Sequence, residues 1–431
     1  MRSRTLLATY ATSGLAIVLA LASSVAIARF LGPEARGQLM AIAFWPYILS
    51  ALLCFAINES TAYHVAQDSA AADSAVSNSF CATGLLLQLA WSAMLVPVVI
   101  AILPFVLRDR GVSNGSVALF ASVYIPLMFI DLHFKAVMQG RGKFRALNGV
   151  RLIQPFGYSL SLILLHAMSA LTVGTAMVAI VGPMFASATV GWAVGGTGLR
   201  GASWASTRSL LATGWHFHLP NLLSYGGSEV DKLIVLSLLD NRQIGYYSVA
   251  LAVGGVGSTL VLQSLIVTLT SEMSRAKSSE DRLAVISSNL NDAAILLAAI
   301  NGFAVVTAAW WLPFVFGEQY RSVLDITAPM LLAGTLKTLR LVIDRALRAM
   351  RQTVNCMIAE AIAFAGICCF GFAGAQWAGL KGFVWGVALA QLCGLATLTL
   401  GAARQLGVRW PELLPLRDLS RSRLLNLLAR G

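Results

Sequence analysis

The chain has 431 residues, of which 57% are hydrophobic and 12% are charged. An ordinary soluble domain carries about 25% charged residues, and a single soluble core rarely grows beyond about 300 residues. The composition therefore excludes a single soluble domain and predicts that most of the chain lies in a membrane.

Apolar stretches of roughly 20 residues recur along the chain, and each is long enough to cross a bilayer as a helix. The alternating pattern of an outer-membrane barrel is absent. The sequence thus predicts an all-α polytopic membrane protein with about 12 transmembrane helices. The predicted spans are residues 8–28, 38–57, 80–107, 115–135, 150–170, 173–197, 211–239, 244–270, 289–316, 323–343, 354–376 and 380–403.

The first stretch has two features of a cleavable signal peptide. It follows the basic sequence MRSR and ends near AIA at 26–28. Its apolar run is about 20 residues long, however, whereas the core of a signal peptide has about 7–15. We therefore expect a first helix that is retained.

The basic residues are distributed unevenly between alternate connecting segments. With the N-terminus inside, 22 of the 31 Lys and Arg residues lie on the cytoplasmic side and 7 on the other. The positive-inside rule then predicts that both termini are cytoplasmic. The net charge of +12 is a topology signal on this interpretation, and the dispersal of the basic residues argues against nucleic-acid binding.

Three short sequence matches lie about half the chain apart. The pairs are LPFVL at 103–107 with LPFVF at 312–316, LGPEARG at 31–37 with LDNRQIG at 239–245, and AVMQGRGKFR at 136–145 with ALRAMRQTVN at 346–355. Their similar offsets predict an internal duplication. Each half then has an even number of spans, so the repeat is parallel, as in many transporters. A duplicated channel or membrane enzyme is the alternative.

The duplication predicts three parts. We expect an N-terminal six-helix bundle over 1–205 and a C-terminal six-helix bundle over 206–404. The last part, 405–431, is basic and partly amphipathic, and such a segment tends to lie on the inner membrane surface.

The seventh predicted span, WHFHLPNLLSYGGSEVDKLIVLSLL, carries a dense set of polar residues. Ionisable residues inside a span are costly and usually face a cavity or a partner. Glu229 and Lys232 are three residues apart, so they can pair on one helix face. Asp231 lies on a neighbouring face, where we expect a functional or gating role. The alternative is an ion pair that packs helices together.

Other ionisable residues lie in the first, tenth and eleventh spans. Arg29 ends the first span, either as an interfacial cation or as one that faces a cavity. Glu360 is an isolated acid in the eleventh span and a candidate proton site. The tenth span carries a polar stripe at helical spacing, formed by Lys337, Arg340, Asp344 and Arg348.

Small residues form a face on the eighth span. Ala250, Gly254 and Ser258 recur every four residues, and such a face permits close helix packing. The six cysteines lie in apolar runs and have neither a CxxC motif nor metal-ligand spacing. We therefore expect small core residues there, with no metal and no cofactor.

Three segments resemble a known family: ARFLGPEARGQL at 28–39, AVMQGRGKFRALN at 136–148 and EVDKLIVLSLLDNRQIGYYSVA at 229–250. They are similar to the polysaccharide-transporter branch of the multidrug/oligosaccharidyl-lipid/polysaccharide (MOP) exporter superfamily, the Wzx-type O-antigen and exopolysaccharide flippases. The resemblance spans nearly the whole chain and implies two six-helix bundles forming a V, as in MATE transporters. It also implies that undecaprenyl-pyrophosphate-linked oligosaccharides move from the cytoplasmic to the periplasmic leaflet of a bacterial inner membrane, without enzymatic chemistry.

The resemblance also implies roles for the ionisable residues. The candidates to bind the pyrophosphate in a cavity are Arg29, Lys232 and Arg340. The candidates for ion coupling or gating, with a proton or a sodium ion, are Asp231, Glu229, Glu360 and Asp344. The implied partners are a lipid-linked oligosaccharide, membrane lipids, a polysaccharide polymerase and a chain-length regulator.

Other functions remain open. A drug or cation antiporter of the same superfamily would require an acidic cavity, whereas the buried charges here are mixed. The lipid II flippase branch often carries additional spans. A membrane-embedded polysaccharide polymerase or ligase would carry a large periplasmic loop, and here the outward connections are short. No Ser-His-Asp set, HExxH motif or phosphate loop stands out either.

Overall fold

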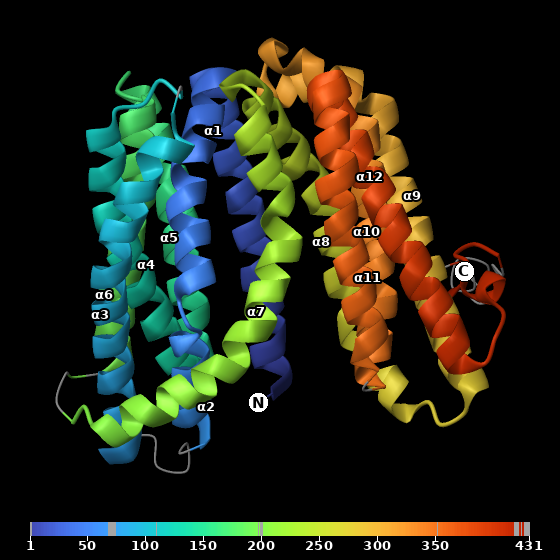
Figure 1. Ribbon diagram of the computed structural model, residues 1–431, viewed down its shortest axis with the longest axis horizontal. Coiled ribbons are helices and arrows are strands. Elements are labelled where there is room, and N and C mark those ends of the chain that lie inside the picture. Colours follow the sequence, from blue (N-terminus) through green and yellow to red (C-terminus); the bar gives the residue numbers. More distant parts are fainter. Residues whose placement is uncertain are drawn as a thin grey trace. The chain divides into compact units, whose positions relative to one another are not determined.

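The computed structural model describes residues 2–67, 75–108, 110–196, 198, 201–350, 352–417, 422, 423 and 425. Regular structure in these residues is helical throughout, with twelve α-helices in chain order (Figure 1). The predicted all-α polytopic fold class is confirmed. The chain forms two compact units, Met1–Gly226 and Gly227–Gly431. The division falls inside α7 (Trp204–Leu238), and the predicted division between 205 and 206 lies at the start of the same helix.

The first unit is built around long helices that pack side by side. In it α1 packs against α5, α5 against α6, α3 against α4, and α4 against α6, while α2 packs on α3 and α4. The N-terminal part of α7 completes the unit. Its other helices are α1 (Arg2–Leu53), α2 (Ile57–Gln67), α3 (Ala75–Val106), α4 (Asn114–Gly140), α5 (Phe144–Ala167) and α6 (Val173–Gly195).

Helix α1 contains two predicted spans and is interrupted between them. Gly32 has φ +82° and ψ 173°, a conformation that a residue with a Cβ rarely adopts, and Pro33 follows it. The buried side chain of Arg36 reaches back across this interruption and donates from Nη2 to Oγ of Ser24 at 2.8 Å. The two segments of α1 are thereby held in a fixed bend.

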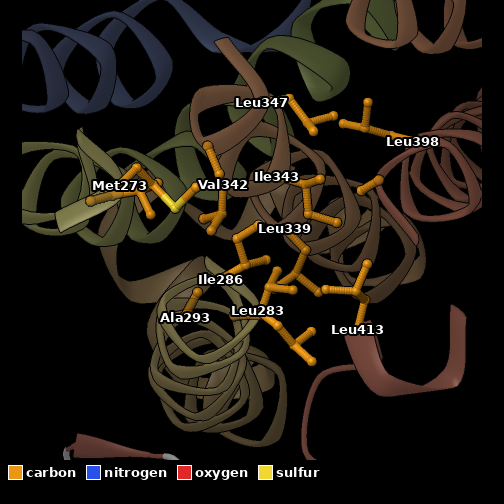
Figure 2. Close-up of a cluster of buried hydrophobic side chains, with 14 of the residues drawn as sticks. Met273, Leu283, Ile286, Ala293, Leu339, Val342, Ile343, Leu347, Leu398 and Leu413 are labelled. Atoms are coloured by element: carbon orange, nitrogen blue, oxygen red, sulfur yellow. The ribbon is translucent and has the colours of Figure 1, made fainter. Parts of the chain in front are cut away.

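The second unit is organised around α10 (Leu324–Ala349), which packs against α8 (Asn241–Arg275), α9 (Ser279–Phe316) and α12 (Phe372–Leu406). Helix α11 (Thr353–Gly366) packs on α12 and joins it through a π-helical turn, Ile367–Gly371. Two 3-10 turns, Glu318–Val323 and Trp410–Leu413, lie beside α9. Figure 2 shows the apolar core of this unit, which includes Met273, Ile286, Val342, Ile343, Leu398 and Leu413.

Eight helical stretches of the described residues are long and apolar enough to cross a membrane. Two of them, Ala11–Leu53 and Thr353–Leu406, each overlap two predicted spans. The predicted spans 150–170 and 211–239 are not among the eight. They lie in α5 and α7, whose polar and charged side chains lower the mean hydropathy.

The segments that match in sequence occupy equivalent places in the two units. LPFVL lies at the end of α3 and LPFVF at the end of α9. The matched basic segments begin where α4 ends at Gly140 and where α10 ends at Ala349. The third pair lies at the bend of α1 and at the turn between α7 and α8. These equivalent helix ends support the predicted duplication.

Part of the predicted surface tail packs on its own unit. The C-terminal strap, defined as residues 410–417 with 422 and 423, buries Leu413 in the core. The amide of Leu416 donates to Oδ1 of Asn291 at 2.8 Å, and Ser422 Oγ donates to Oδ1 of Asp292 at 2.7 Å. The remainder of the predicted tail, residues 418–421, 424 and 426–431, lies outside the described residues.

A bidentate ion pair fastens the strap to the end of α8. Arg423 donates from both terminal nitrogens to the two carboxylate oxygens of Glu272, each at 2.6 Å, and from Nε to Ser288 Oγ at 3.0 Å. The hydrogen bonds from Arg423 hold the pKa of Glu272 below its ordinary value. A bidentate pair of this kind fixes the relative orientation of the two side chains and adds to the strength of the interaction.

We expect acid to loosen the strap. Because the pKa of Glu272 is lowered on folding, the pair contributes fully above the unfolded value, near 4.3, and is lost as the pH falls through the folded value. Both side chains are partly exposed, so the effect is small, about 1 kcal/mol or less. Hydrogen exchange of the Leu416 amide should therefore accelerate about two- to fivefold in Glu272→Gln at neutral pH. Glu318→Gln is the control, since its partner Arg321 is 3.8 Å away in solvent. Equal exchange in both variants contradicts the expectation.

Glycines allow the two segments of α12, which is interrupted at Ala378 and Gly379, and the π-helical turn before it to pack backbone against backbone. A Cβ on Gly386 would collide with the carbonyl oxygen of Phe370, and one on Gly382 with that of Gly374. In contrast, a Cβ on Gly302 of α9 would meet nothing within 4 Å. These backbone contacts therefore exclude side chains at Gly382 and Gly386.

We expect Gly386→Ala to lower the free energy of unfolding by about 1–3 kcal/mol, because the added methyl group must displace backbone. The control Gly302→Ala should be neutral or stabilising by up to about 1 kcal/mol, since alanine favours a helix. Thermal unfolding of the detergent-solubilised proteins, followed by tryptophan fluorescence, measures both. Similar melting temperatures for the two variants would refute the close approach.

Candidate functional site

The part of α7 in the second unit presents charges on two faces. Lys232 Nζ lies 2.5 Å from Oε2 of Glu229, one helical turn earlier. The pairing predicted from their spacing is confirmed. Both side chains are mostly buried, so the charge of each is already compensated by the other.

Asp231 is directed elsewhere. Its Oδ2 accepts a hydrogen bond from the hydroxyl of Tyr247, which lies on α8 and is 1% exposed. Its Oδ1 is buried and has no hydrogen-bond partner among the described residues. A buried carboxylate oxygen without a donor is costly, so this atom calls for a proton, a cation or a donor from outside the protein.

Asp231 lines a cavity of about 260 Å³ inside the second unit. The walls come from α7, α8, α10, α12 and the π-helical turn. Among the lining residues Asp231 is the acid and Lys337 of α10 is the base, and Gln391 of α12 adds an amide. This charged cavity, as we name it, therefore has no net formal charge.

Small residues create the wall between α8 and α10. A Cβ on Gly334 would lie 3.1 Å from Ser258 Oγ and 3.2 Å from the carbonyl oxygen of Gly254. Gly254, Ser258 and Gly334 all line the charged cavity. The predicted small-residue face of the eighth span is thus confirmed, and it brings α8 and α10 together at the level of the cavity.

Two lining side chains besides Asp231 have unmet hydrogen-bonding capacity. The Lys337 ammonium makes no hydrogen bond or ion pair with any residue that the structure describes. Gln391 is 5% exposed, and its Oε1 is buried without a partner in the same part of the chain. Among the described residues, the cavity lining thus includes one cation that has no acceptor, Lys337, and two oxygens that have no donor, on Asp231 and Gln391.

Arg340 and Glu360 form a second ion pair in this unit. Arg340 Nη1 lies 2.5 Å from Glu360 Oε2, and the arginine side chain is 4% exposed. A Cβ on Gly227 would lie 2.5 Å from Glu360 Oε1, so the carboxylate also rests against α7. The expectation that Glu360 is an isolated acid is wrong, because its partner comes from a helix that the spacing within its own span does not indicate.

The remaining predicted residues lie apart from the cavity lining. Asp344 Oδ2 accepts from Arg348 Nε at 2.7 Å, as their spacing of four residues allows. Arg29 belongs to the first unit and is exposed, just before the bend at Gly32. None of Arg29, Glu229, Lys232, Arg340, Asp344 and Glu360 is among the lining residues of the charged cavity.

The first unit contains its own buried charge pair. Asp131 accepts from Lys135 Nζ at 2.5 Å and from Ser187 Oγ at 2.6 Å. The three groups satisfy one another and join α4 to α6. Within the described residues, no group of three or more His, Cys, Asp and Glu side chains could hold a metal ion.

Sequence reasoning placed Lys337 in a polar stripe but not in a cavity. It also missed Tyr247 and Gln391 as neighbours of Asp231. The cost of a lysine inside a span was a usable signal for Lys337. Tyr247 lies in the IGYYSVA segment that was singled out for its resemblance. Nothing in the sequence around Gln391 distinguishes it from a packing residue.

We expect Glu360→Gln to destabilise the second unit, because the change leaves the buried Arg340 guanidinium without its counter-charge. Breaking a fully buried pair costs about 3–5 kcal/mol. Glu360 is 38% exposed, so we expect about 2 kcal/mol, since solvent screens part of the loss. Glu318→Gln, which removes an exposed pair, should change the free energy of unfolding by less than about 0.5 kcal/mol. The melting temperatures of the two variants measure this difference, and equal values would show that the Arg340–Glu360 pair does not stabilise the unit.

The fold is shared with solved membrane transporters. An inward-facing multidrug resistance MATE family transporter of the MOP superfamily has a TM-score of 0.74 at 13% identity, covering 91% of this chain and 94% of its own. The lipid II flippase MurJ in an inward closed conformation has a TM-score of 0.76 at 13% identity, covering 98% and 90%. An outward-facing MATE transporter of the same superfamily has a TM-score of 0.60 at 15% identity, covering 94% of each chain.

The sequence itself matches a family model described as "Polysaccharide biosynthesis protein" over residues 26–325. A search of curated protein sequences found no match. The family and the fold together confirm the predicted resemblance to the polysaccharide-transporter branch. The chain therefore belongs to the polysaccharide biosynthesis protein family and is a multi-pass membrane protein with the fold of MOP-superfamily transporters and flippases.

Proposed function

We propose that the protein is a flippase for a polysaccharide precursor. Its substrate is an oligosaccharide repeat unit linked to undecaprenyl pyrophosphate, which it moves from the cytoplasmic to the periplasmic leaflet of a bacterial inner membrane by alternating access. The process is coupled to a proton or a sodium ion. The family match supports a role in polysaccharide synthesis, and the fold supports transport.

Physical chemistry explains why such a substrate requires a protein. A sugar headgroup with a pyrophosphate would have to lose its hydrogen bonds to water in order to cross hydrocarbon. Transfer of polar groups without replacement partners costs several kcal/mol for each group, and far more for a charge. A polar cavity within a membrane-spanning unit replaces those partners, while the polyprenyl tail remains in lipid.

The observation that carries the proposal is the charged cavity of the second unit. It places an acid and a base in a lining whose other residues are uncharged. Charges in such positions are rare and usually mark a substrate or ion pathway. A protein that served purely as a scaffold would gain nothing from an unpartnered carboxylate oxygen at Asp231.

The structure supports different roles for the candidate residues. Asp231 is the proposed coupling or gating residue, because it lines the cavity, one of its oxygens has no hydrogen-bond partner among the described residues and the other is held by Tyr247. Glu229, Glu360 and Asp344 are paired with basic residues, so we propose that they gate by exchanging partners. Arg29, Lys232 and Arg340 remain proposed pyrophosphate ligands, and the last two must first leave their carboxylates.

The charge of the cavity argues against export of cationic drugs. An antiporter for cations requires a net negative site, whereas Lys337 balances Asp231 in the cavity lining. Both termini are proposed to be cytoplasmic, which follows from the distribution of Lys and Arg. A polysaccharide polymerase and a chain-length regulator are the proposed partners.

The leaflet in which the precursor accumulates tests this function. Deletion of the gene should leave complete lipid-linked oligosaccharides on the cytoplasmic side, protected from an enzyme supplied to the periplasm. Complementation with the wild type should restore accessibility, and Asp231→Asn should restore less than about a tenth of it, because the variant cannot change charge. The loss of one charge-changing group corresponds to about 1.4 kcal/mol or more in the rate-limiting barrier.

Glu318→Gln is the matched control, since it removes a carboxylate that is 78% exposed. It should complement as well as the wild type. Normal leaflet distribution and normal surface polysaccharide in the deletion strain, with no second flippase present, would refute the proposed function.

A further inference from the structure

The charged cavity contains hydrogen-bond donors and acceptors that have no partners among the residues described. Asp231 Oδ1 and Gln391 Oε1 are buried acceptors that receive no hydrogen bond in the described part of the chain. Lys337 lines the same cavity, and its ammonium has three donors. The unmet donors and acceptors are complementary, although they are not joined in this structure.

Lys232 and Arg340, the cations proposed as pyrophosphate ligands in this unit, are already paired with carboxylates. Lys232 and Arg340 each lie 2.5 Å from a carboxylate oxygen. An anionic ligand could reach either of them only after its ion pair has broken, which costs free energy. Lys337 is available to an anion without that cost.

The size of the cavity limits what can occupy it. At about 30 Å³ for each water molecule, a volume of about 260 Å³ holds roughly nine waters. A diphosphate group has a similar number of non-hydrogen atoms, whereas an oligosaccharide is several times larger. The cavity therefore has room for the diphosphate of a prenyl-linked substrate.

Charge determines when such an anion can enter. With Asp231 ionised, the lining carries one negative and one positive charge, so a diphosphate is repelled and attracted about equally. Once a proton or a sodium ion neutralises Asp231, the ammonium of Lys337 is the sole remaining charge of the lining. Neutralisation and anion binding should thus favour each other, and the coupling must be reciprocal.

We propose that Lys337, which lines the same cavity as Asp231, binds the substrate diphosphate when a proton or a sodium ion neutralises Asp231. This inference rests on the proposed function, because it names the residue that receives the anionic part of the same substrate. It makes Lys337 the principal pyrophosphate ligand of the second unit, ahead of Lys232 and Arg340.

Binding of a short prenyl diphosphate to the purified full-length protein in lipid nanodiscs tests this inference. The probe is farnesyl diphosphate, and farnesol is its uncharged counterpart. In the wild type the diphosphate should bind more tightly as the pH falls or as sodium is added, by about 5- to 150-fold, the range of typical coupling. Asp231→Asn should bind tightly at every pH and sodium concentration.

Lys337→Gln should weaken binding of farnesyl diphosphate at least tenfold and leave binding of farnesol unchanged. Lys337→Arg should retain most of the affinity, because the charge is preserved. Lys381→Gln is the control, since it removes an exposed cation of α12 that does not line the cavity. Unchanged farnesol binding and melting temperature show that each variant is folded.

Two results would overturn the inference: wild-type affinity for the diphosphate in Lys337→Gln, or an unchanged response to pH and sodium in Asp231→Asn. The leaflet assay separates this failure from failure of the proposed function. If the deletion strain accumulates precursor on the cytoplasmic side but Lys337→Gln binds the diphosphate normally, the proposed function stands and the role of Lys337 is refuted. If the deletion strain has a normal leaflet distribution but the variants bind the diphosphate as expected, the anion site stands and the flippase function is refuted.

Discussion

Compensation of charge inside an apolar helical unit is the constraint on which the second unit depends. An ionised side chain away from water requires a partner, and the unit supplies one at 2.5–2.7 Å for Lys232, Arg340 and Asp344. The Arg340–Glu360 pair joins α10 to α11, whereas the other two pairs lie within α7 and within α10. Asp231 and Lys337 are the two charges of the cavity lining that lack such compensation, which is why function is assigned to them.

Glycine and serine make this arrangement possible. Close packing of α8 on α10 at Gly254 and Gly334 forms one wall of the cavity that Asp231 lines. Gly227 has a similar effect on the other side, because Glu360 occupies the space that a larger residue would need. Thus the residues with the smallest side chains decide where the charged ones can lie.

The sequence was sufficient where the physics is local. Lengths of apolar runs predicted most spans, spacing of three residues predicted the Glu229–Lys232 pair, and spacing of four predicted the packing face of α8. It was insufficient where partners come from separate helices. Arg340 and Glu360 are 20 residues apart, and Arg423 reaches Glu272 across 151. Helical periodicity carries no information about such contacts, nor about the orphaned amide of Gln391.

The charged cavity also bears on how a diphosphate can move through an energised membrane. Each elementary charge carried across the membrane potential changes the free energy by about 2.3 kcal/mol per 100 mV. A diphosphate that crossed alone carries more than one negative charge, so the membrane potential would change its free energy by a multiple of this amount. One that binds Lys337 while a cation occupies Asp231 moves with part of its charge compensated. Coupling to a cation and recognition of the anion are then two consequences of the same pair of residues: loss of the Asp231 charge removes the response to the cation, and loss of the Lys337 charge removes the affinity for the anion.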